Sequence, residues 1–224
     1  MCFSAGASFG ASALLCVVGV LALKRTTSPS QVMFAAIPLI FSAQQFTEGV
    51  VWLALANPAY NAWKANSVFA FLFFAQVLWP LWASLAVLSM ETDPGRKKTL
   101  WALAGVGLAV SLYLAHHLAS APATAHISSH HIYYAQNFPI ATLWFSGLVY
   151  FLPTVAPLLI SSVKNMWIMG LSVLLSYLVT HLFYAEYLTS VWCYFAAVIS
   201  IQVLLIIRSP RPHPARETAL RPNL

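Results

Sequence analysis

Histidines are the residues of this sequence whose spacing most resembles a set of metal ligands. His126, His130 and His131 form a His-x-x-x-His-His run. If that segment is helical, two imidazoles lie one turn apart, which is a spacing used to chelate zinc, copper or iron. Further donors elsewhere in the chain would complete the ligand shell, namely His116, His117, His181, Cys2 and Cys193. The run therefore predicts a metal site with zinc, copper or iron as cofactor.

The neighbours of the histidine run leave two other interpretations open. Ala-Pro-Ala-Thr before it and Ser-Ser within it are more typical of an extended loop than of a helix. In a solvated loop the histidines would titrate near neutral pH and do nothing more, or they would act as a proton relay or pH sensor.

Glu48 is an acidic residue within a long apolar segment. It lies eight residues before the end of that segment, which in a helix is roughly 12 Å below the end. Gln44 and Gln45 lie four and three residues before Glu48 in the same segment, and Gln76 of the next segment reaches a similar depth. A carboxyl group there costs several kcal/mol unless it is paired, hydrogen-bonded or protonated, so it predicts a functional site. The alternative is a neutral glutamic acid that bonds Gln44 or Gln76 and holds two helices together.

Two later apolar segments carry rows of hydroxyl groups at a spacing of four residues. The first row is Thr142, Ser146, Tyr150 and Thr154, and the second is Ser172, Ser176 and Thr180. Such rows let helices pack closely or line a polar cavity, and both interpretations stay open. We expect the cavity, if formed, to be lined by Gln44, Gln45, Gln76, Tyr150 and Tyr177.

Cys2 and Cys193 fall near the same ends of the first and last apolar segments. In an oxidising compartment the simplest interpretation is a disulfide bond between them. Metal ligation and a nucleophilic thiol are the alternatives. The candidate catalytic residues are Glu48, His181 and Cys193.

The composition indicates which solvent surrounds these groups. Of 224 residues, 60% are hydrophobic and only 7% are charged, against roughly a quarter charged in soluble domains. The net charge of +6 comes from residues scattered over short loops and a tail, with no motif for binding nucleic acid. The chain is therefore predicted to be an integral membrane protein with the lipid bilayer as its main partner.

Apolar runs separated by polar or proline-containing breaks predict an all-α bundle of seven transmembrane helices. The runs cover residues 5–23, 32–56, 66–90, 99–119, 140–161, 165–185 and 188–207. We expect residues 1–208 to form the transmembrane domain and residues 209–224 to form a flexible, basic, proline-rich tail.

The basic residues predict the orientation of the bundle. Ten of the eleven fall in alternate loops or in the tail, and Lys64 alone falls on the opposite side. Because basic loops stay on the cytoplasmic side, we expect the N-terminus outside, the C-terminus inside, and a bacterial cytoplasmic membrane as the location. Every histidine except His213 then lies at or beyond the outer ends of the helices.

Several short motifs carry a resemblance to a known family. They are Met1-Cys2-Phe3-Ser4-Ala5, Ala7-Ser8-Phe9, Gln44-Gln45-Phe46 with Glu48-Gly49 and Trp52, Trp79-Pro80, and Ser190-Val191-Trp192-Cys193. Together they resemble a family of uncharacterised bacterial multi-pass membrane proteins. The resemblance implies a multi-helix membrane protein and brings no established substrate, cofactor or catalytic residue.

Three functions are therefore predicted. The first is a metal-dependent enzyme that acts on a lipid or small amphiphile through an outer-face site of histidine, cysteine and glutamate. The second is a proton-coupled transporter that uses Glu48. The third is an accessory subunit whose aromatic faces bind another membrane protein.

Overall fold

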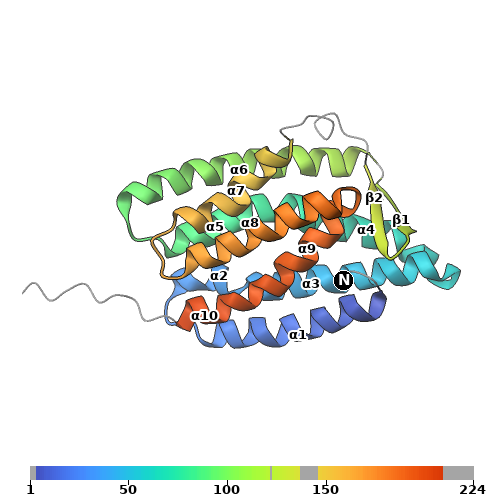
Figure 1. Ribbon diagram of the computed structural model, residues 1–224, viewed down its shortest axis with the longest axis horizontal. Coiled ribbons are helices and arrows are strands. Elements are labelled where there is room, and N and C mark those ends of the chain that lie inside the picture. The colour runs from blue at the N-terminus through green and yellow to red at the C-terminus, as the bar shows by residue number, and fades with distance from the viewer. Residues whose placement is uncertain (1–3, 122, 137–145, 209–224) are drawn as a thin grey trace, which may run out of the picture.

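The computed structural model describes residues 4–121, 123–136 and 146–208, and these residues form an all-α bundle with one small β-hairpin (Figure 1). In chain order the elements are α1 (Ala5–Lys24), η1 (Pro29–Gln31), α2 (Val32–Ala35), α3 (Ile37–Ala56), η2 (Pro58–Trp63), α4 (Lys64–Leu72), η3 (Phe73–Leu78), α5 (Trp79–Met90), α6 (Pro94–Ser120), β1 (Thr124–Ser128), β2 (His131–Ala135), α7 (Ser146–Ile160), α8 (Met166–Phe183), η5 (Ala185–Tyr187), α9 (Leu188–Ile199), η6 (Ser200–Gln202) and α10 (Val203–Arg208). Cys2 and the predicted tail at 209–224 lie outside the described residues.

The seven predicted apolar segments are confirmed as helical segments. Six of them are long and apolar enough to cross a membrane: Ala5–Lys24, Pro29–Ala56, Pro58–Met90, Pro94–Ser120, Met166–Phe183 and Ala185–Ile207. The seventh, Gly147–Ile160, is apolar but shorter within the described part of the chain. The protein is a polytopic integral membrane protein.

The bundle has two chemically different ends (Figure 1). The basic end carries helix-terminal and turn residues, namely Lys24, Arg25, Arg96, Lys97, Lys98 and Lys164. The opposite end, here the hairpin end, carries β1 and β2 together with η2 and η5. Polar caps start the helices beside these turns, as where Asp93 Oδ1 accepts a hydrogen bond of 2.8 Å from the Arg96 N–H.

Irregular backbone in two neighbouring helical segments is bridged by hydroxyl groups. Pro157 has no N–H for the Pro153 carbonyl in α7, and the Ser84 hydroxyl of α5 donates to that carbonyl at 2.8 Å. The π-helical segment η3 directly precedes α5 and interrupts its regular α-helical pattern. The Tyr150 hydroxyl of α7 donates to the Ala75 carbonyl within this segment.

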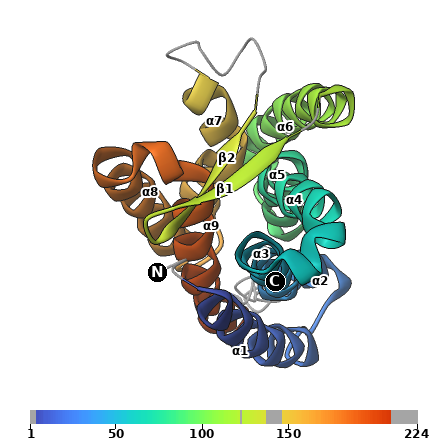
Figure 2. The same ribbon diagram turned by 90° about the vertical axis from the view of Figure 1, so that its right-hand side faces the viewer.

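The β-hairpin lies across the end of the bundle (Figure 2). Its strands pair antiparallel, with Ala125 opposite Tyr134 and Ile127 opposite Ile132. Ala125 and Ile132 are buried against the helices, and the Tyr134 ring stacks on Phe71 of α4 at a centroid distance of 4.8 Å. An alternating strand with an apolar inner face therefore closes the bundle at this end.

Glu91 ties two turns together at the basic end. Its Oε1 accepts hydrogen bonds from the N–H groups of Thr92 and Asp93 and from the Ser162 hydroxyl, while its Oε2 accepts from the Ser162 N–H and the Ser161 hydroxyl. Burial opposes ionisation of this carboxyl group, but the hydrogen bonds outweigh it and lower its pKa from 4.5 to about 2. The side chain thus holds the end of α5 against the end of α7.

Substituting Gly107 tests the close packing of α5 against α6. A β-carbon at Gly107 would lie 2.3 Å from the Pro80 carbonyl oxygen, so the helices would have to separate. Gly107→Ala is expected to destabilise the protein by roughly 1–3 kcal/mol, measured as thermal unfolding in detergent. Gly105→Ala is the matched control, because nothing lies within 4 Å of its added β-carbon. Equal stability of the two variants would contradict the packing described here.

Substituting Glu91 tests the contact between the two turns. Glu91→Gln is expected to cost about 2 kcal/mol of stability at neutral pH, because it removes a charged acceptor of several hydrogen bonds. A lowered pKa stabilises the fold above the ordinary value of 4.5, and this stabilisation is lost as the pH falls towards about 2. The stability difference from the unsubstituted protein should therefore shrink over that interval. The exposed Glu186, changed to Gln, should show no such difference.

Candidate functional site

Glu48 is fully buried between α3 and α9. The Ser190 hydroxyl of α9 donates a hydrogen bond of 2.5 Å to its Oε1. Its Oε2 has no hydrogen-bond partner among the described residues. Glu91 at the basic end is the instructive contrast, because both of its oxygens accept hydrogen bonds. One oxygen of the Glu48 carboxyl group therefore lacks a hydrogen bond in the protein interior, where an unpaired polar group costs free energy.

Gln44 and Gln45 add further unsatisfied groups on the same helix. Both are fully buried. Gln44 Oε1 accepts a hydrogen bond of 2.7 Å from the Trp79 indole N–H, but its Nε2 has no partner in the described structure. The Gln45 amide is near enough to Glu48 to interact with it electrostatically, yet neither of its polar atoms reaches hydrogen-bonding geometry with a described residue. We call Gln44, Gln45, Glu48 and Ser190 the polar cluster.

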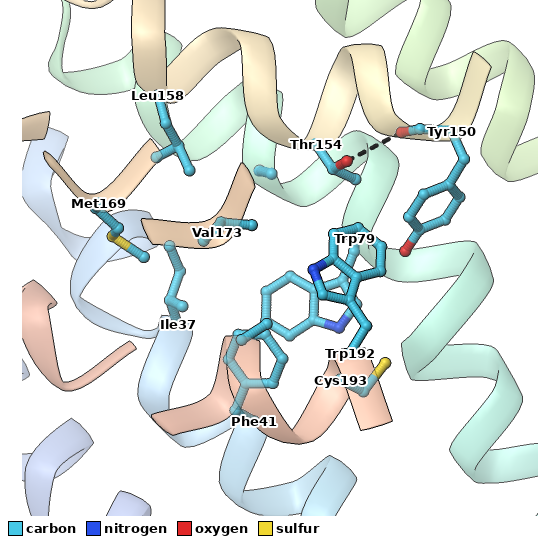
Figure 3. Close-up of a pocket in the computed structure, with 12 residues that line it drawn as sticks. Ile37, Phe41, Trp79, Tyr150, Thr154, Leu158, Met169, Val173, Trp192 and Cys193 are labelled. Carbon is cyan, nitrogen blue, oxygen red and sulfur yellow. Dashed lines mark hydrogen bonds between the residues drawn. The ribbon is translucent and has the colours of Figure 1, made fainter. Parts of the chain in front are cut away.

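An apolar pocket lies between α3, α5, α7, α8 and α9 (Figure 3). Its empty space is about 600 Å³, part of it open to the surroundings. Ile37 and Phe41 form its wall on α3, and Gln44 and Glu48 continue the same helical face. The pocket and the polar cluster are therefore neighbouring parts of one site.

Cys193 joins the two parts. Its side chain is buried and lines the pocket, and it lies near enough to Glu48 and Gln44 to interact with both. It is a free thiol, and the predicted partner Cys2 lies outside the described residues. Among the predicted catalytic residues, Glu48 and Cys193 are brought together.

Of the predicted cavity residues Tyr150 and Tyr177, only Tyr150 is among the residues that line the pocket. Its hydroxyl donates to the Ala75 carbonyl. Both tyrosines meet Trp192 edge to face, at centroid distances of 5.9 Å for Tyr150 and 5.2 Å for Tyr177. Tyr150 thus contributes ring surface to the pocket wall, and the pocket is more apolar than the polar rows predicted.

Gln76 has a different partner from the one predicted. Its amide pairs reciprocally with Gln136, which directly follows β2, through bonds of 2.5 and 3.0 Å. In the described structure both of its amide atoms therefore bond Gln136 rather than Glu48, and its place in the lining of a polar cavity stays a prediction. Gln76 instead anchors the hairpin to the π-helical segment.

The helical geometry considered for the histidine run is corrected by the structure. His126 lies on β1 and His131 on β2, so the run is a hairpin with His130 exposed at its turn. His126 packs against the Tyr133 ring. His131 stacks on Tyr187 of η5 at 4.6 Å, and burial lowers its pKa below the ordinary value. The chelating pair of a single helical turn is therefore not formed.

The other described histidines, His116, His117 and His181, lie on helices and not on the hairpin. His116 and His117 are neighbours on α6 with ring centroids 5.5 Å apart, and His181 is an exposed residue of α8 stacked on Tyr177. Among the described residues, no three side chains of histidine, cysteine, aspartate or glutamate gather closely enough to hold a metal ion. The donor set at 4–121, 123–136 and 146–208 therefore does not fit the predicted zinc, copper or iron.

Two important residues of the site were not selected by chemical reasoning from the sequence. Ser190 is the hydrogen-bond partner of Glu48, and Trp79 is the partner of Gln44. Both belong to the short motifs that carry the family resemblance, Ser190-Val191-Trp192-Cys193 and Trp79-Pro80. Those motifs were the available signal, since they cluster in space around Glu48.

A scan against protein families matches residues 1–219 to a family of unknown function, DUF6629. A search of curated proteins and a search of solved structures found no match. The family match covers nearly the whole chain and confirms the resemblance to an uncharacterised family with no established activity. The chain therefore belongs to the family of unknown function DUF6629.

Proposed function

We propose that this protein is a proton-coupled membrane carrier whose substrate site is the polar cluster with its adjoining pocket. The observation that carries the proposal is the fully buried Glu48 carboxyl group, which has one oxygen bonded to Ser190 and the other without a hydrogen-bond partner among the described residues. A group in that situation favours a proton or a bound polar ligand, because either would satisfy it.

The irregular helices beside the pocket support a carrier. Trp79 and Ala83 line it from α5, directly after the π-helical segment, and Thr154 lines it from α7, between two prolines. Discontinuous helices form the buried substrate sites of many carriers. Helices α5 and α7, which help to wall the pocket, thus have irregular backbone beside it.

The surroundings of Glu48 also suit proton exchange. The titratable group that faces it from α9 is the Cys193 thiol. The described lysine and arginine side chains lie at the ends of the bundle, and none of them pairs with Glu48 within the structure described. A proton or a cationic ligand is thus the simplest compensation for its charge.

The other predicted functions have less support. A metal-dependent enzyme needs at least three converging donors, and the described residues bring no such group together. An accessory subunit would use lipid-facing rings such as Phe46 and Trp101, but exposed rings are ordinary at a bilayer and select no partner. We also propose that the protein lies in the cytoplasmic membrane of a bacterium with its basic end inside, because basic loops stay on the cytoplasmic side.

Infrared spectroscopy of the purified protein tests whether Glu48 exchanges protons. We expect the carbonyl stretch of a protonated carboxyl group to appear and disappear reversibly with pH, and to be missing in Glu48→Gln. Glu186→Gln is the matched control, because that carboxyl group is exposed. A Glu48 signal that stays constant across the pH range would instead identify a permanently neutral bond between helices and overturn the proton coupling.

Labelling of Cys193 tests alternating access without knowledge of the substrate. In a Cys2→Ser, Cys16→Ser background, a membrane-impermeant maleimide should modify Cys193 in vesicles of either orientation, because a carrier exposes its site to both sides in turn. The control is Asn61→Cys at the exposed η2 turn, made in the same background with Cys193→Ser added. Its cysteine should react from one side only. Reaction of Cys193 from one side alone, or from neither, would contradict a carrier.

A further inference from the structure

The pocket is divided into an aromatic wall and an aliphatic wall. Figure 3 shows the rings of Phe41, Trp79, Tyr150 and Trp192 grouped together, with Leu158, Met169 and Val173 on the other side. The Phe41 and Trp79 rings are stacked at 4.0 Å with an interplanar angle of 23°. The aromatic wall is thus held in place by ring contacts.

The orientation of the indoles is also set by neighbouring groups. The Trp79 N–H is directed to Gln44 of the polar cluster. Trp192 is held between Tyr150 and Tyr177, each at an interplanar angle of 72°. Rigid, electron-rich rings of tryptophan and tyrosine are the side-chain surfaces that attract a cation most strongly.

The charge at the site favours the same sign of ligand. Glu48 is the acidic residue of the polar cluster, and no lysine, arginine or histidine lines the pocket in the described structure. A phosphate or carboxylate ligand would therefore find no cationic partner there and would be repelled by an ionised Glu48. A cation would compensate the carboxylate and contact the aromatic wall at the same time.

The space and the second wall define the rest of the ligand. About 600 Å³ of space lies between the walls, and part of it is open to the surroundings. The aliphatic wall of Leu158, Met169 and Val173 offers no hydrogen bond to a polar substituent. A ligand that fills the pocket must therefore carry an apolar body as well as a charge.

We propose that the pocket binds an organic cation with an apolar body, whose charge lies between Glu48 and the aromatic wall. The inference rests on the proposed carrier function and names its substrate class. The cation and the proton compete for the Glu48 carboxylate, and the Cys193 thiol is a titratable group near it in the described part of the chain. Binding of the cation then expels a proton, which provides the coupling.

Equilibrium dialysis of tetraphenylphosphonium against the purified protein in detergent tests the proposal. Tetraphenylborate has the same shape and the opposite charge, so the protein should bind it at least about tenfold more weakly than the phosphonium. Glu48→Gln should weaken phosphonium binding by about tenfold or more and remove its increase with rising pH. Glu186→Gln should leave binding unchanged, because Glu186 is exposed at η5.

The aromatic wall is tested separately from the carboxylate. Trp192→Leu should weaken phosphonium binding by about tenfold, whereas Trp101→Leu, on the exposed surface of α6, should not. If Trp192→Leu does not purify as a folded protein, Phe41→Leu removes another ring of the same wall. Unchanged binding in the aromatic-wall variant that folds would overturn the role of the aromatic wall.

The outcomes distinguish this inference from the function on which it rests. Equal binding of phosphonium and borate, or no binding of either, overturns the cation class, while labelling of Cys193 from both sides would still support a carrier. Strong phosphonium binding with one-sided labelling overturns the carrier and supports a cation receptor at the same pocket.

Discussion

Within hydrocarbon, a carbonyl that has lost its helical partner needs a donor from another helix, and this constraint joins α5 to α7. Pro157 removes the N–H that the Pro153 carbonyl would otherwise accept from, and the Ser84 hydroxyl of α5 donates to that carbonyl. Across the same interface the Tyr150 hydroxyl of α7 donates to the Ala75 carbonyl of the π-helical segment before α5. The interrupted backbones are therefore fixed side by side, and the pocket lies directly next to them.

The bundle contains two buried glutamates in opposite situations. Glu91 is surrounded by N–H and hydroxyl donors from two turns, and both of its oxygens are satisfied. Glu48 receives one hydrogen bond from Ser190, and the Nε2 of Gln44 and both polar atoms of Gln45 lie nearby without partners among the described residues. A structural role accounts for every feature of the first carboxylate. The second retains unused hydrogen-bonding capacity in the interior, which is the condition for binding something else.

The hairpin explains why the site is enclosed towards one end. Ile132 and Cys193 belong to the same apolar cluster, so the inner face of β2 and the top of the pocket share a core. The pair of Gln76 with Gln136 fastens the hairpin to the π-helical segment. The histidines of the hairpin belong to this cover, with His131 stacked on Tyr187, and the described histidines form no metal-binding group with Glu48. The hairpin with its histidines thus covers the site, and the polar cluster around Glu48 carries its reactive groups, whereas the histidine spacing had predicted that the histidines would do so.

The sequence by itself determined the all-α class, the seven apolar segments and the burial of Glu48, because hydrocarbon requires long apolar helices and penalises an isolated carboxyl group. It also determined that Gln44 and Gln45 accompany Glu48, since helical spacing is a local property. Only the tertiary structure decided that Ser190 bonds Glu48, that Gln76 pairs with Gln136, and that the histidine run is a hairpin. Those contacts join residues from 60 to 142 positions apart or depend on strand pairing. Neither composition nor periodicity records which helices become neighbours, because adjacency is set by packing between faces that are equally apolar in the sequence.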